Sequence, residues 1–143
     1  MSFQNSDLVD WTEFESVREE LGANFARILR YFSEDGTKSV DAIEQAMRDK
    51  VTVALIVPAH TLKGEALQFG ALRLSMIAEK IEMVARHLVE IQQTPEELVP
   101  EAVALRPVFK ETMVSLEEAT NPLVQRRSAI PDQIAANQKF GRL

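Results

Sequence analysis

The chain has 143 residues, of which 45% are hydrophobic and 27% are charged, and this composition is typical of one globular domain rich in helix formers. It contains no cysteine, which excludes a disulfide framework and any thiolate metal site. The net charge is -6, and because residues 121–143 carry +3, residues 1–120 carry -9 and form a poor partner for nucleic acid. No apolar run has membrane-spanning length and the N-terminus lacks signal-peptide character, so we expect a cytoplasmic protein without a membrane partner.

The first predicted element is a short amphipathic helix near residues 8–17. Asp10 and Thr12 are both candidate N-caps for it. Its apolar positions have helical spacing: Leu8, Trp11, Phe14 and Val17. Gly22 predicts a break or bend after this helix, which we expect to close one end of a helical bundle.

Residues 22–49 carry the next helical pattern, which has an ambiguous middle. Ser33 to Gly36 has the composition of a short turn. The pattern therefore predicts either one long helix with a weak point near Gly36 or two shorter helices. In both cases it supplies a long arm of the bundle.

The third pattern contains His60 and ends near Phe69. Its apolar positions are spaced by 4, 3, 4 and 3 residues and form one seam: Leu55, Ala59, Leu62, Ala66 and Phe69. If Thr52 caps this helix, Pro58 lies inside it and should kink it; alternatively the helix begins near Pro58. Gly70 marks a bend or a point of close packing.

Two further patterns complete the expected fold. Residues 74–91 give a sustained apolar stripe, the clearest helix in the sequence, and Thr94 to Glu97 predicts a capping box with proline at the first helical position. Residues 105–119 predict a last helix, interrupted by Pro107. We expect an all-α protein: an antiparallel up-down four-helix bundle over residues 1–120 with a short extra N-terminal helix, and a C-terminal tail over 121–143 in which residues 130–140 could form a short helix.

Three residues of the His60 helix suggest a chemical function. Lys63 and Gly64 lie on the same face as His60, because three or four residues complete about one turn. A neutral histidine, whose reference pKa is about 6.5, is a nucleophile near neutral pH without an activating base. Lys63 offers a mobile positive charge for a phosphoryl group, and Gly64, which costs a helix about 1 kcal/mol relative to alanine, leaves access for an incoming group. The set predicts a phosphorylatable histidine.

This stretch resembles the histidine-containing phosphotransfer (HPt) domains of two-component phosphorelays, and the resemblance extends over about residues 7–120. The motif residues are His60, Leu62, Lys63, Gly64, Phe69 and Gly70. The chain departs from the family pattern at Glu65, Ala66 and Leu67, and by having Pro58 before the histidine. The resemblance implies a phosphocarrier and not an enzyme, in which His60 is the phosphoacceptor, Lys63 the charge support and Gly64 the access gap. It further implies that His60 exchanges its phosphoryl group with the aspartate of a response-regulator receiver domain, and that a histidine kinase, simple or hybrid, is a second partner.

The chain itself is expected to bind no cofactor. It has no glycine-rich phosphate loop and so no evident ATP site. It also has no helical Glu-x-x-His pair, so no metal site is expected. The resemblance implies that Mg²⁺ and most of the catalytic apparatus belong to the receiver. Two rival interpretations are a detached kinase-type phosphoacceptor domain and a non-catalytic helical adaptor that binds receiver or kinase domains; the oligomeric state stays open between monomer and homodimer.

Ile56, Leu67 and Gln68 are candidate partner-binding residues. Ile56 and Leu67 flank His60 on its own face, where they either belong to a broad, partly buried stripe or form a docking surface. Gln68 either hydrogen-bonds near the site or faces solvent. Other polar residues receive simpler interpretations: a surface position for His87, and a solvated acidic face for Glu79, Glu82 and Glu90.

Overall fold

The computed structural model describes residues 7–120, which divide into two compact units, residues 7–112 and residues 113–120. The regular elements in this part of the chain are all helical: α1 (Trp11–Leu21), η2 (Gly22–Asn24), α2 (Phe25–Asp49), η3 (Thr52–Leu55), α3 (Ile56–Gln68), α4 (Leu72–Glu90), η4 (Pro95–Leu98) and α5 (Val99–Thr120). The second unit is the helical end of α5. The predictions for residues 121–143 lie outside the described residues.

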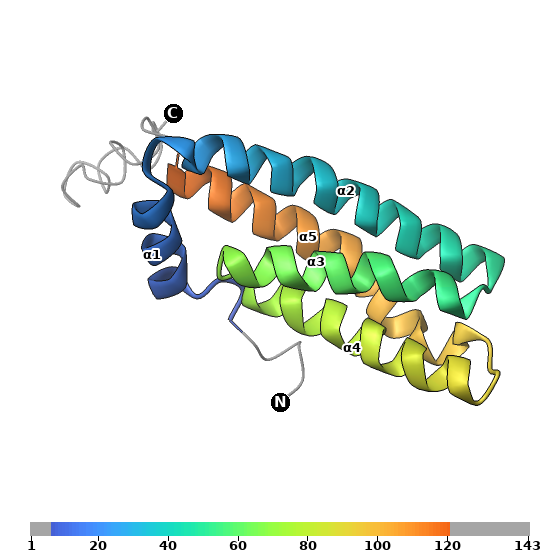
Figure 1. Ribbon diagram of the computed structural model, residues 1–143. Coiled ribbons are helices and arrows are strands. Elements are labelled where there is room, and N and C mark those ends of the chain that lie inside the picture. The colour runs from blue at the N-terminus through green and yellow to red at the C-terminus, as the bar shows by residue number, and fades with distance from the viewer. Residues whose placement is uncertain (1–6, 121–143) are drawn as a thin grey trace, which may run out of the picture. The chain divides into compact units, whose positions relative to one another are not determined.

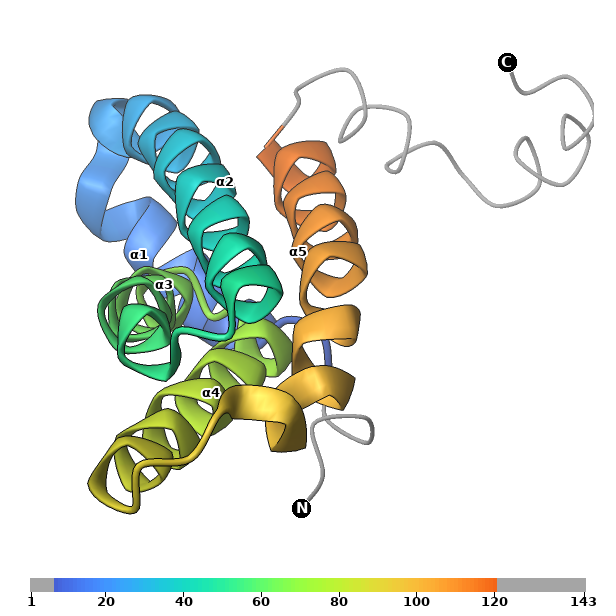
Figure 2. The ribbon, with the colours of Figure 1, turned by 90° about the vertical axis from the view of Figure 1, so that its right-hand side faces the viewer.

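In the first unit, α2, α3 and α4 run alternately up and down (Figure 1). Helix α3 packs against both α2 and α4, and the part of α5 up to Thr112 completes the set (Figure 2). Arg106 of α5 pairs with Glu44 of α2 at 2.8 Å, and Glu101 of α5 pairs with Lys80 of α4 at 2.7 Å. The all-α up-down bundle with a short N-terminal helix is therefore confirmed.

The apolar seam predicted for the His60 helix lies in the core. All five seam residues are at most 1% exposed: Leu55, Ala59, Leu62, Ala66 and Phe69. Phe69 also stacks on Phe32 of α2 with ring centroids 5.2 Å apart, and it meets Phe25 edge to face. This burial fixes the rotation of α3 about its axis and thereby decides which residues face outward.

Helix α1 closes the bundle at the Phe69 end. Of the two candidate caps, Asp10 is the one used, because its side chain accepts from the backbone N–H groups of Thr12 and Glu13. Asp10 also donates its backbone N–H to the carbonyl of Gly70 at 2.7 Å. Gly70 has a φ of +72°, and a Cβ there would lie 2.6 Å from the Asp10 carbonyl oxygen. Gly70 thus serves both predicted purposes, a bend and a close approach.

Helix α2 is continuous through Gly36, so the interpretation as two helices separated by a turn is wrong. A Cβ at Gly36 would lie 2.5 Å from Cε1 of Phe109. The glycine is therefore required for close packing against α5 and does not break the helix.

Helix α3 begins at Ile56 after the 3₁₀ turn η3. Pro58 is its third residue, where a missing N–H costs little because the first helical N–H groups lack intrahelical partners. This agrees with the alternative in which the helix begins near Pro58. The capping role predicted for Thr52 is wrong, because its hydroxyl donates to the carbonyl of Gln93 at 2.8 Å.

The last helix begins earlier than predicted and is not interrupted. It starts at Val99 and continues through Pro107. Pro95 is the first residue of η4, as expected, but the capping box is wrong: the Thr94 hydroxyl donates to the carboxylate of Glu96 and caps no backbone N–H. Within residues 7–120, no helix combines the length and the apolar character needed to cross a membrane.

Candidate functional site

His60 lies on the outer face of α3, one residue from the buried seam. Its side chain is 63% exposed, while its neighbour Ala59 is fully buried. The rotation of α3 set by the seam therefore turns the imidazole outward, as the sequence predicts.

A buried carboxylate of α4 fixes this imidazole. Nδ1 of His60 lies 2.9 Å from Oε2 of Glu82. Lys63 reaches the other oxygen, Oε1, with its Nζ at 2.9 Å. Arg86, one turn further along α4, donates to Oε2 from Nη2 at 2.8 Å and from Nε at 3.2 Å. One carboxylate thus joins the two predicted residues of α3 to a cation of α4.

The environment of Glu82 keeps its carboxyl group ionised. The residue is only 5% exposed, and this burial by itself raises its pKa. The hydrogen bonds from Lys63, Arg86 and His60 outweigh burial and lower the pKa to about 2 from the ordinary 4.5. At neutral pH the site therefore contains a fixed negative charge beneath the imidazole.

This charge decides which imidazole nitrogen is available. An ionised carboxylate can only accept hydrogen bonds, so Nδ1 of His60 carries the proton and donates it to Glu82. In the neutral ring the other nitrogen, Nε2, is then unprotonated and has a lone pair. The arrangement presents one oriented nucleophilic nitrogen on an exposed ring.

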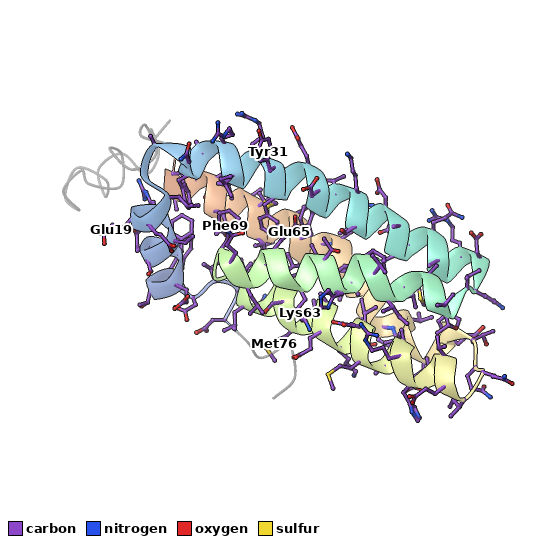
Figure 3. All side chains as sticks on the ribbon, in the orientation of Figure 1. Glu19, Tyr31, Lys63, Glu65, Phe69 and Met76 are labelled. Carbon is purple, nitrogen blue, oxygen red and sulfur yellow. The ribbon has the colours of Figure 1, made fainter. Side chains whose placement is uncertain are left out.

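Lys63 and Gly64 occupy the places that the helical spacing predicts. Lys63 is 24% exposed and extends along the α4 side of α3 (Figure 3). Gly64 is exposed, and a Cβ there would meet nothing within 4 Å. The fold of the described residues therefore gives no packing reason for a glycine at this position, in contrast to Gly36.

The three candidate partner-binding residues differ in exposure. Leu67 is 54% exposed and Gln68 is exposed, whereas Ile56 is partly buried. Ile56 therefore belongs to a broad, partly buried apolar stripe, whereas Leu67 is available on the surface for a partner. The sequence did not single out Val57, which is 71% exposed and lies one turn before His60 on the same face. The sequence could have indicated this position, because Val57 precedes His60 by three residues, which is about one helical turn.

The interpretation of Glu82 as part of a solvated acidic face is wrong. Glu82 lies between the buried residues Ala78 and Ala85 on the inner side of α4, where three cationic or hydrogen-bonding side chains compensate its burial. The stripe spacing of 78, 82 and 85 indicated an inward position. His87 is exposed, as predicted, with its Nδ1 3.9 Å from Glu90. The described residues contain no group of three or more His, Cys, Asp or Glu side chains arranged to hold a metal ion.

Comparisons with known proteins bear on the family and the fold of the chain. A family model described as the Hpt domain matches residues 27–134. A search of curated proteins gives no significant match. The crystal structure of histidine-containing phosphotransfer protein B (HptB) from Pseudomonas aeruginosa PAO1 is similar in fold, with a TM-score of 0.71 and 18% sequence identity over 85% of this chain and 98% of that chain. Since the family model spans well over half of the sequence, the chain belongs to the Hpt domain family of histidine phosphotransfer proteins.

Proposed function

We propose that His60 is the phosphoacceptor of this Hpt domain and that Nε2 is its reacting atom. The observation that carries this assignment is the 2.9 Å contact between Nδ1 of His60 and the buried carboxylate of Glu82. Because that contact engages Nδ1, the exposed ring has Nε2 available for a partner. His87 has no comparable buried carboxylate, since its acidic neighbour Glu90 is itself 78% exposed.

The reaction needs no base on this chain. The lone pair of Nε2 attacks the phosphorus of an aspartyl phosphate on a receiver domain, and the bond from phosphorus to the aspartate oxygen breaks. The aspartate leaves as a carboxylate, and a phosphorus–nitrogen bond forms on His60. The ring keeps its Nδ1 proton and becomes positively charged, and the Glu82 carboxylate stabilises that charge. Reversal of the same step passes the phosphoryl group to the aspartate of a second receiver.

Lys63 and Gly64 support this transfer in different ways. Nζ of Lys63 lies on Glu82, adjacent to the His60 ring, and a flexible lysine can turn from the carboxylate toward phosphoryl oxygens. Gly64 leaves the surface one turn beyond His60 without a side chain. The receiver would supply the Mg²⁺ and the remaining catalytic groups, so this chain acts as a carrier without an ATP site.

Exposed apolar residues on α3 favour a protein partner at this face. Val57 and Leu67 lie on either side of His60 along the helix and are 71% and 54% exposed. Exposed apolar side chains around a reactive residue are typical of docking surfaces. We assign this face to the receiver, with Gln68 at its border; the cytoplasmic location expected from the sequence stays a prediction.

The test is phosphorylation by a partner. The protein is incubated with a histidine kinase, ATP and a receiver domain, and acid-labile, base-stable phosphate is measured on the wild type, on His60→Gln and on His87→Gln. We expect label on the wild type and on His87→Gln but not on His60→Gln. Label that persists on His60→Gln would place the phosphoryl group elsewhere. A wild type that binds receivers but acquires no label from any of them would support the adaptor interpretation instead.

A further inference from the structure

The two cations that contact Glu82 bind different oxygens of its carboxylate. Lys63 extends from α3 and contacts Oε1 with its single nitrogen, Nζ, at 2.9 Å. Arg86 donates to Oε2 from two nitrogens, Nη2 at 2.8 Å and Nε at 3.2 Å. Nδ1 of His60 lies on the same oxygen, Oε2, at 2.9 Å. The arginine therefore fixes the oxygen that orients the imidazole, whereas the lysine occupies the other oxygen.

The contact between Arg86 and Glu82 lies within one helix. The two residues are four positions apart on α4, so their side chains are neighbours one turn apart. This contact does not depend on how the side chains of α3 move. A planar guanidinium keeps its donors in a fixed arrangement, while the ammonium group of a lysine moves on a flexible four-carbon stem. Of the two cations, Lys63 is thus suited to leave the carboxylate and Arg86 is suited to stay.

Departure of Lys63 from Glu82 is costly unless another cation remains. Glu82 is 5% exposed, and its Oε1 atom is buried. A buried carboxylate without a positive partner is strongly disfavoured. The reactive form of the His60 ring is neutral, so it supplies a hydrogen bond to the carboxylate but no positive charge. Among the described residues, the other cation that contacts Glu82 is Arg86, which therefore allows Lys63 to turn toward phosphoryl oxygens.

We propose that Arg86 is a positioning residue of the phosphotransfer site: it holds the Glu82 carboxylate against His60 while Lys63 leaves that carboxylate to neutralise the phosphoryl group. Arg86 acts through Glu82 and does not contact the phosphoryl group. Without Arg86, Lys63 stays bound to Glu82, and the phosphoryl group lacks its positive partner. This inference rests on the proposed function of His60 and extends the site to a residue of α4 outside the sequence motif.

The first test needs no phosphoryl group, because Lys63→Gln reproduces the site without the lysine. Carbon-13 NMR of the side chains measures the pKa of Glu82, whose signal is identified by its loss in Glu82→Gln. If Arg86 is sufficient to hold the carboxylate, the pKa of Glu82 in Lys63→Gln stays below the ordinary 4.5. Adding Arg86→Gln to Lys63→Gln should raise that pKa by at least about 1. A pKa at or above 4.5 in Lys63→Gln, or an equal pKa in the single and double variants, would overturn the proposal.

The second test is a double-mutant cycle on the single-turnover rate of transfer from a phosphorylated receiver domain. Arg86→Gln should slow transfer at least about fivefold more in the wild-type background than in the Lys63→Gln background. Arg86→Lys, which keeps a positive charge beside Glu82, should recover part of the rate. The receiver concentration that gives the half-maximal rate should not change, because Arg86 acts through Glu82. Equal slowing in both backgrounds, no recovery in Arg86→Lys, or an effect on that concentration alone would contradict the proposal.

Lys80→Gln is the matched control on the α5 side of α4. Lys80 pairs with Glu101 at 2.7 Å, and both this pair and the pair of Arg86 with Glu82 join a cation that is 56% exposed to a carboxylate that is 6% exposed. Lys80→Gln should leave the transfer rate unchanged, and an equal loss of rate in Lys80→Gln and Arg86→Gln would overturn the proposal. A wild type that acquires no label contradicts the proposed function and with it this inference. A labelled wild type whose transfer rate Arg86→Gln leaves unchanged contradicts this inference alone.

Discussion

Replacing Glu82 by glutamine tests the central contact of the site, because it keeps the shape of the side chain and removes its charge. The pKa of Glu82, lowered from 4.5 to about 2, corresponds at face value to about 3 kcal/mol of stability at neutral pH. Its partners Lys63 and Arg86 are 24% and 56% exposed, so water screens part of this interaction. We therefore expect Glu82→Gln to lower the free energy of unfolding by about 1–2 kcal/mol at pH 7.

The pH dependence of this loss separates charge from packing. A group with a lowered pKa stabilises the fold above its unfolded pKa, and the stabilisation is lost as pH falls toward the folded value. Urea unfolding of the wild type and Glu82→Gln should thus differ most at neutral pH and converge as pH falls from about 4.5 toward 2. Comparing the two proteins at each pH cancels the titration of groups that do not interact with Glu82. Equal stabilities at pH 7, or a difference that does not change with pH, would refute the reasoning.

Three further substitutions test the site and its support. Gly64→Ala should raise the free energy of unfolding by about 1 kcal/mol, because its Cβ meets nothing, while slowing phosphotransfer from a receiver; a faster or unchanged transfer rate would contradict the access role. Gly36→Ala should instead lower the free energy of unfolding, measured in urea, by about 1–3 kcal/mol, because its Cβ would lie 2.5 Å from the Phe109 ring. The loss should be smaller in a Phe109→Leu background, where that ring is absent. Leu67→Glu should slow phosphotransfer from a receiver yet change the free energy of unfolding by less than about 0.5 kcal/mol. Val103→Glu, at a 70% exposed position on α5, is the control and should leave the transfer rate unchanged. Equal effects of the two changes on the rate would argue against docking at α3.

The sequence predicts the bundle and the outward position of His60 because both follow from apolar periodicity. A seam spaced by 4 and 3 residues determines the rotation of α3, and that rotation places Lys63 and Gly64 beside His60. Residues that usually mark a turn or the end of a helix, such as glycine, are less reliable guides. Gly36 looks like a turn in the sequence, yet its role is set by Phe109, 73 residues away, which no local pattern reveals.

The predictions fail where a polar residue depends on a partner distant in sequence. Thr52 looks like a helix cap, but its hydroxyl bonds the carbonyl of Gln93. Glu82 looks solvated because glutamates usually are, and its burial depends on cations that α3 and α4 bring together only in the fold. In both cases the sequence contains the donor and the acceptor, but not their proximity.

Glu82 and Glu65 lie on opposite flanks of α3, and the charged neighbours of each decide whether its pKa is lowered or raised. Desolvation raises the pKa of both Glu82 and Glu65. On the α4 flank, three donors outweigh it and keep Glu82 negative beneath His60, which suits the positive ring that the proposed phosphorylation of His60 would produce. On the α2 flank, Asp35 adds to it and favours a neutral Glu65. The fixed negative charge of Glu82 in α4 therefore lies on the side of α3 where the proposed phosphorylation of His60 would create a positive ring, whereas on the α2 side the pKa of Glu65 is raised to about 7.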